Sequence, residues 1–143
     1  MAFDYGERRI GVAFANTRTL LATALTTLAA RDGEPTWQEL DTLVADWEPE
    51  VLVTGLPYNM DGSESQLTKK VRAFADQIGS RYELPVELVD ERLTSLEASS
   101  LLRQQRQEGL RKRRLRREEI DSHAARLIAE SWLEHLNVNN KNA

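Results

Sequence analysis

Short apolar runs and longer amphipathic stretches follow one another along this chain of 143 residues. The apolar runs predict β-strands over residues 2–15, 20–28, 51–55 and 86–89. The first of these ranges is expected to hold two strands joined by a tight turn at Gly6. Apolar side chains at helical spacing predict α-helices over residues 37–47, 67–78, 94–107 and 120–136. This order predicts one α/β domain over residues 1–138, a mixed β-sheet flanked by helices, followed by a flexible polar tail over residues 139–143.

Local signals predict where several elements begin and end. Thr36 and Glu39 form a capping-box pattern before the first helix, and Pro49 ends that helix. Ser65 is the expected N-cap of the second helix. The first strand, at residues 2–4, is shorter than the typical length of about five or six residues. Such a short strand is expected if the natural start lies upstream of residue 1 or if residues were trimmed.

The composition removes several classes of site. The chain has no Cys, which excludes disulfides, thiolate catalysis and zinc–thiolate sites and suggests a reducing compartment, the cytoplasm. Because His123 and His135 are the only histidines, a His-rich metal site is not expected. No apolar run approaches the roughly 20 residues of a membrane span, so no membrane partner is expected. The start also lacks a signal-peptide pattern.

Charge is distributed unevenly along the chain. A net charge of −4 and a pI of about 5.3 argue, taken alone, against a generic nucleic-acid binder. Residues 103–117, however, hold eight basic side chains and one acid, a local charge of +7 that leaves −11 for the rest. An acidic body with one basic segment suits a metal-dependent enzyme acting on a polyanion. A solvated basic loop is the alternative.

Acidic residues lie at the ends of three predicted elements. Asp4 ends the first strand, Asp90 and Glu91 follow the strand over residues 86–89, and Asp121 stands at the front of the last helix. Carboxylates from two strand ends and a helix can converge on a divalent metal ion, an arrangement suited to phosphodiester hydrolysis. Successive strand residues point to opposite faces, so one of Asp90 and Glu91 is expected to face the site. Taken singly, each acid also has a structural explanation, as a turn residue or as a partner of the helix dipole.

A polar loop over residues 55–65 follows the strand predicted to be central. Loops at the carboxyl ends of strands bind ligands in open α/β sheets, so Asp61, Ser63 and Ser65 are candidates for contact with phosphate. The alternative is a plain strand-to-helix connection. His123 is expected to be a surface or hydrogen-bonded residue rather than a catalytic base.

Four segments together resemble the YqgF (RuvX) family of Holliday-junction-resolvase-like proteins of bacteria. They are AFDYGERRIGVA at 2–13, GLPYNMDGSES at 55–65, VDERLTSLEA at 89–98 and IDSHAA at 120–125. The resemblance covers nearly the whole chain, and only the short first strand departs from it. It implies a ribonuclease H-like fold and nuclease chemistry. Carried over by motif, the catalytic carboxylates are Asp4, Asp121 and the acid of the DER motif, which is Glu91 with Asp90 as its rival.

The family is associated with processing the 5′ end of precursor 16S ribosomal RNA, and resolution of four-way DNA junctions is its other proposed role. The expected partner is therefore structured RNA or branched DNA. The residues of this chain do not choose between the two substrates, and they do not specify an oligomeric state.

The resulting hypothesis is a nuclease in which Asp4, Asp121 and either Asp90 or Glu91 hold one or two Mg²⁺ or Mn²⁺ ions. Nucleic acid is expected to contact basic and polar side chains of the four motifs and the basic segment: Arg8, Arg9, Asn59, Ser63, Arg92, Arg111, Lys112, Arg113, Arg114, Arg116 and Arg117.

Two other functions are compatible with parts of the sequence. A non-catalytic RNA-binding module would need only the fold and the basic segment. An ATPase of the actin and sugar-kinase type would also begin with an acid-x-Gly hairpin. That second alternative is weaker because the chain is too short for two ATP-clasping lobes and has no second hairpin of this kind.

Overall fold

The computed structural model describes the backbone of residues 1–90 and 117–141. Its elements, in chain order, are β1 (Ala2–Asp4), β2 (Arg9–Asn16), β3 (Leu21–Arg31), β4 (Glu34–Pro35), α1 (Trp37–Trp47), β5 (Leu52–Leu56), α2 (Gln66–Tyr82), β6 (Val86–Asp90) and α4 (Arg117–Lys141). The predicted order is confirmed over these residues, with one added strand. The helix predicted over residues 94–107 lies outside the described part of the chain.

The strands form one six-stranded sheet in the order β4-β3-β2-β1-β5-β6. The first three strands are an antiparallel meander, and β1, β5 and β6 run parallel to one another. The sheet is therefore mixed, as the sequence predicted. Since parallel strands point the same way, β1, β5 and β6 all end at the same edge of the sheet, which is where ligands bind in open α/β sheets.

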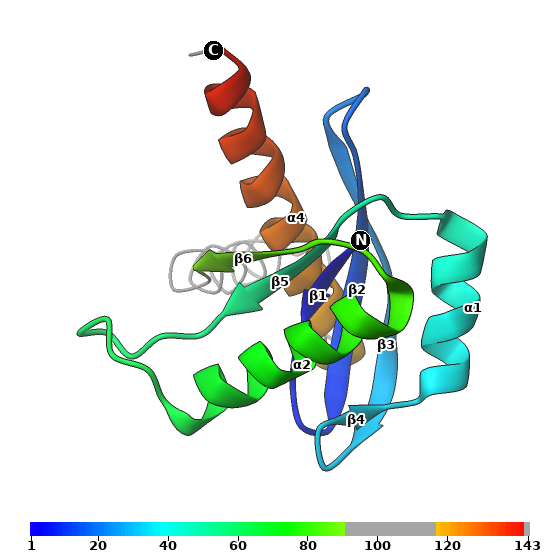
Figure 1. Cartoon of the computed structure of the whole chain (residues 1–143), viewed down its shortest axis with the longest axis vertical. Helices are drawn as coiled ribbons and strands as arrows, with labels where there is room; N and C mark the ends of the chain where they lie inside the picture. Colours follow the sequence, from blue (N-terminus) through cyan, green and yellow to red (C-terminus); the bar gives the residue numbers. More distant parts are fainter. Residues whose placement is uncertain (91–116, 142–143) are drawn as a thin grey trace, which may run out of the picture.

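The two faces of the sheet bury different side chains. Phe3, Ile10 and Leu52 pack with residues of α1 and α2 on one face. Ala2, Ala13 and Val53 pack against α4 on the other face, so that the sheet lies between helices (Figure 1). The residues on the α4 face are small, which lets this helix lie close to the strands. No helix of the described residues is long and apolar enough to cross a membrane.

The helix ends agree with the sequence in one case and differ in another. Ser65 caps α2 as predicted: its hydroxyl accepts from the Thr68 N–H at 3.2 Å, and the Thr68 hydroxyl accepts from the Ser65 N–H at 3.0 Å. Thr36 is the N-cap of α1 but makes no capping bond, so the predicted capping box is wrong. Its hydroxyl donates instead to the Ala29 carbonyl at 3.0 Å, which ties the start of α1 to β3.

One strand is added to the predicted pattern and one helix is longer than predicted. Asp32 and Gly33, both with positive φ, form a tight turn that pairs Glu34 and Pro35 back onto β3 as the short strand β4. Two residues, one of them a proline, carry too little signal to predict a strand. Helix α4 already includes Arg117 and continues to Lys141, so Asp121 does not lie in its first turn as predicted.

A charged contact joins α1 to α2. Arg81 donates to both carboxylate oxygens of Asp41, at 2.8 and 2.7 Å, and the Tyr82 hydroxyl donates to Asp41 at 2.7 Å. The hydrogen bonds from Arg81 and then Tyr82 lower the pKa of Asp41 from 3.8 to about 2.

Asp41→Asn is expected to lower stability near neutral pH and to have no effect near pH 2. Because the folded-state pKa is depressed, the contact stabilises the protein above about pH 4, and this contribution is lost as pH falls through about 2. Thermal unfolding between pH 6 and pH 2 measures the difference from wild type, with Glu39→Gln on the same helix as the control. A difference that stays constant down to pH 2 would contradict the assignment.

Candidate functional site

Asp4 lies on the face of the sheet that α4 covers. It is the last residue of β1 and pairs with Gly11 of β2. Side chains alternate along a strand, and Ala2 packs on the α4 face while Phe3 packs on the opposite face. Asp4 therefore points to the same face as Ala2. Its side chain is half-buried at the sheet edge where the parallel strands end.

Gly11 brings α4 against the sheet beside Asp4. A Cβ atom at Gly11 would lie 2.0 Å from the backbone carbonyl oxygen of Asp121, so the helix backbone occupies the space of a side chain. Because Gly11 is also the cross-strand partner of Asp4, the backbones of these three residues lie together. The structure thus places the backbones of the first and last acidic motifs on either side of one glycine.

Arg9 supplies a cation to this arrangement. Its Nε donates to Oδ2 of Asp121 at 2.9 Å, and both side chains are partly exposed, at 33% and 24%. Arg9 is two residues before Gly11 on β2, so it also points to the α4 face. The predicted nucleic-acid contact Arg9 is thus an ion-pair partner of a predicted catalytic acid.

Asp90 is the last residue of β6. Earlier in β6, the Glu87 carboxylate accepts a hydrogen bond from the indole of Trp132 in α4, and Val89 packs with the core on the α4 side. Alternation along the strand then directs the exposed Asp90 side chain away from α4, although Asp90 also borders a depression between the end of β6 and α4. Its rival Glu91 lies outside the described residues. Among residues 1–90 and 117–141, no group of three or more acidic or histidine side chains is placed to hold a metal ion.

A depression of about 520 Å³ opens beside the Arg9–Asp121 pair. It is lined by the turn after β1, the first residue of β2, the first turns of α2 and one residue of α4: Gly6, Glu7, Arg8, Arg9, Gln66, Leu67, Lys70 and Asp121. Lys70 donates to Glu7, and this hydrogen bond raises the pKa of the lysine. Arg8 is exposed at the rim. The depression therefore places the cationic side chains of Arg8, Arg9 and Lys70 near Asp121.

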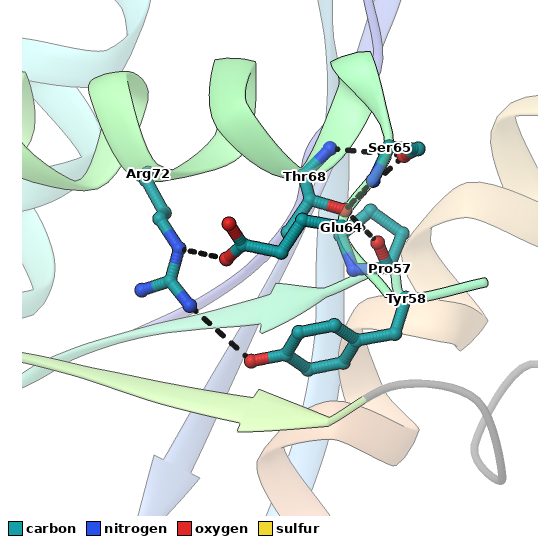
Figure 2. A network of polar contacts seen from close by, with 6 residues as sticks. All are labelled: Pro57, Tyr58, Glu64, Ser65, Thr68 and Arg72. Atoms are coloured by element: carbon teal, nitrogen blue, oxygen red, sulfur yellow. Dashed lines mark hydrogen bonds and ion pairs between the residues drawn. The ribbon is translucent and has the colours of Figure 1, made fainter. Parts of the chain in front are cut away.

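The loop between β5 and α2 closes on itself through its polar side chains. The Asn59 amide donates to the Ser63 hydroxyl at 2.9 Å, and that hydroxyl donates to Asp61 at 2.6 Å. At the base of the loop, Arg72 binds Glu64 at 2.6 Å (Figure 2). Asn59 and Ser63, predicted to contact nucleic acid, thus use these groups to hold the loop.

Most of the predicted basic contacts fall outside the described residues. These are Arg92, Arg111, Lys112, Arg113, Arg114 and Arg116, and of Arg117 only the helical backbone is described. The sequence interpretation had overlooked Gly11, whose contact with α4 positions Asp121, and Lys70, which lines the depression. A glycine inside an apolar strand is the signal that could have indicated the first.

The meander, the parallel strands that follow it and the helices on both faces define a ribonuclease H-like α/β fold. Over 94% of its length, the chain matches Thermus thermophilus RuvC solved in complex with a Holliday junction substrate, with a TM-score of 0.52 and 14% identity over 93% of that chain. It also matches the yeast mitochondrial Holliday junction resolvase Ydc2, with a TM-score of 0.51 and 14% identity over 99% of this chain and 82% of that one. Identities this low show the fold alone.

The family model for RuvX, described as Holliday junction resolvase, matches residues 1–135, and the chain belongs to this family. A relative from Coxiella burnetii (strain Dugway 5J108-111) is 47% identical over 94% of this chain and 91% of its own length. One from Sodalis glossinidius is 46% identical over 94% and 92% of the two chains. Both relatives carry the name "Putative pre-16S rRNA nuclease".

Proposed function

We propose that this chain is a divalent-metal-dependent nuclease that hydrolyses phosphodiester bonds and trims the 5′ end of pre-16S rRNA in the cytoplasm. The observation that supports the proposal is that the backbones of Asp4 and Asp121 both lie beside Gly11, at the edge of the sheet where β1 ends. Membership of the RuvX family and the names of the relatives support nuclease chemistry and the RNA substrate.

The donor set at this edge suits a hard cation. Asp4 and Asp121 offer carboxylate oxygens, the ligands that Mg²⁺ and Mn²⁺ prefer, and we assign Glu91 as the third. Side-chain alternation in β6 directs Asp90 away from α4, so we do not assign Asp90 to the site. When bound, such a metal ion supplies an activated water and stabilises the leaving oxygen.

In this proposal Arg9 pairs with Asp121 in the free protein and with a phosphate of the bound substrate. Partly exposed ion pairs contribute at most about 1 kcal/mol, so the Arg9 contact with Asp121 can be exchanged at little cost. Released from the carboxylate, the guanidinium can bind two oxygens of a substrate phosphate. Arg8 and the basic segment 111–117 would hold flanking phosphates without choosing a sequence.

Cleavage of a pre-16S rRNA fragment that contains the 5′ processing site tests the proposal. The wild-type chain is expected to cut this RNA with Mg²⁺ or Mn²⁺, to leave a 5′ phosphate and to stop when EDTA is added. Glu91→Gln should lose at least about 100-fold in rate, because removing even the partner of a metal ligand costs 10- to 100-fold. Asp90→Asn should cut nearly as fast as wild type.

The outcomes separate the candidate functions. Metal-independent cutting, or equal rates for Glu91→Gln and wild type, would contradict the assigned site. RNA binding without any cutting would indicate the non-catalytic module. A second candidate, junction resolution, is favoured by the description of the family. A four-way DNA junction in the same assay tests it, and faster cutting of the junction than of the RNA would favour that activity.

A further inference from the structure

An exposed methionine stands at the tip of the loop between β5 and α2. Met60 is 86% exposed, more than any other large hydrophobic side chain of the described residues. Figure 1 shows this segment extending away from the body of the protein between the end of β5 and the start of α2. A single exposed apolar residue is ordinary on a protein surface, so its significance depends on how the loop holds it.

The tip of the loop is a hydrogen-bonded turn. The Gly62 N–H donates to the Asn59 carbonyl at 2.8 Å, and the Asn59 N–H donates to the Ser63 carbonyl at 2.9 Å. Gly62 has a φ of +87°, a conformation that favours glycine and lets the chain reverse directly after Asp61. Met60 is therefore presented at the apex of a closed turn.

The base of the loop is fastened to α2. Arg72 pairs with Glu64 and donates to the Tyr58 hydroxyl at 3.3 Å, and the buried Thr68 hydroxyl donates to the Pro57 carbonyl (Figure 2). The residues on both sides of the loop tip are thus hydrogen-bonded to the same helix. A side chain on this tip is positioned in advance, which lowers the entropy lost when it packs against a ligand.

The chemistry of the loop favours an apolar partner surface over phosphate. The Asn59 amide donates a hydrogen bond to the Ser63 hydroxyl, and the Ser63 hydroxyl donates one to Asp61. Glu64 adds a second acid, whose charge Arg72 balances. Residues 57–65 thus contain two acids and no basic residue, so the loop itself does not attract a phosphate backbone. The group that remains for contact is the flexible, polarisable side chain of Met60, which packs well against aromatic faces.

We propose that Met60 is a wedge that packs against the exposed face of a nucleobase where the base stack is interrupted. Such an interruption occurs at a helix end, a bulge or a branch point, and apolar side chains enter base steps in this way. The loop begins where β5 ends, at the same sheet edge as Asp4. This proposal rests on the proposed nuclease function and adds that the substrate is recognised by its interrupted stack.

Fluorescence of 2-aminopurine tests the wedge. Three probes carry this base: a four-way DNA junction at the branch, an RNA hairpin in a bulge, and an uninterrupted duplex. With EDTA present to prevent cleavage, the wild-type chain is expected to raise the fluorescence of the junction or the RNA hairpin. Met60→Ala should abolish this rise and weaken binding of that probe about fivefold, with duplex binding unchanged. Met60→Leu should retain both properties.

Leu21→Ala is the matched control, because Leu21 is 66% exposed at the opposite end of the sheet. It should behave as wild type with every probe, and circular dichroism should show all variants folded. If Met60→Ala matched wild type in affinity and fluorescence with both interrupted probes, the wedge alone would be overturned. If the wild-type chain bound none of the probes, the proposed function would fail and the wedge with it.

Discussion

Asp121→Asn should reduce the rate of metal-dependent cleavage at least about 100-fold while the protein stays folded. Asparagine keeps the size of the side chain but removes the charge that we assign to metal binding, and loss of a metal ligand costs more than the 10- to 100-fold caused by loss of its partner. The ion pair with Arg9 is also lost, but a partly exposed pair contributes at most about 1 kcal/mol. The melting temperature should therefore change little.

Asp4→Asn should have the same effect, since both acids are assigned to one site. Asp46→Asn provides the control, because Asp46 is an exposed aspartate of α1, whose core contacts lie on the opposite face of the sheet. Initial rates at saturating Mn²⁺, together with thermal melts, measure both quantities. Rates for Asp121→Asn and Asp4→Asn within a few-fold of wild type would remove these carboxylates from the chemistry.

Gly11→Val is expected to lower the free energy of unfolding by about 3 kcal/mol, at the upper end of the usual range for overpacking. A Cβ atom would lie 2.0 Å from the Asp121 carbonyl oxygen, and 2.5 Å from its carbon, both backbone atoms that cannot rotate away. Valine is otherwise favourable in a strand, so propensity does not explain the loss. Chemical denaturation measures it, and cleavage should fall as well because α4 carries Asp121.

Gly79→Ala is the matched control for this substitution. Its Cβ would meet a methyl group of Val86 at 3.0 Å, and a side chain can shift where backbone cannot. Gly79 also lies in α2, where alanine is favoured over glycine by about 1 kcal/mol. The stability of this variant should stay close to that of wild type. Equal stability of Gly11→Val and wild type would show that α4 does not depend on contact with β2.

The order of the elements could be predicted because each element carries its own periodicity. The apolar run at residues 51–55 indicated a strand buried on both faces, and β5 does lie between β1 and β6. Asp4 and Asp121 were identified as candidates from their places at the ends of elements. Their meeting could not be derived from spacing, because it depends on the close approach of α4 to Gly11, a tertiary contact.

Side-chain hydrogen bonds were the least predictable feature. The sequence around Thr36 is typical of a helix N-cap, but the Thr36 hydroxyl donates its hydrogen bond to a carbonyl of β3 instead. Asn59 and Ser63 suggested phosphate contacts, yet they bond within their own loop. In both cases the residue type indicated a polar partner, and only the folded chain determined which one.

Direct binding of Mn²⁺ to the wild-type chain and its variants tests the central claim, that Asp4 and Asp121 share one cation. Electron paramagnetic resonance of free Mn²⁺ gives the affinity without substrate or turnover. The wild-type chain and Asp46→Asn should bind the ion equally, and Asp4→Asn and Asp121→Asn should each bind it at least about tenfold more weakly. Equal affinity of all four proteins, or no binding by any of them, would contradict the account.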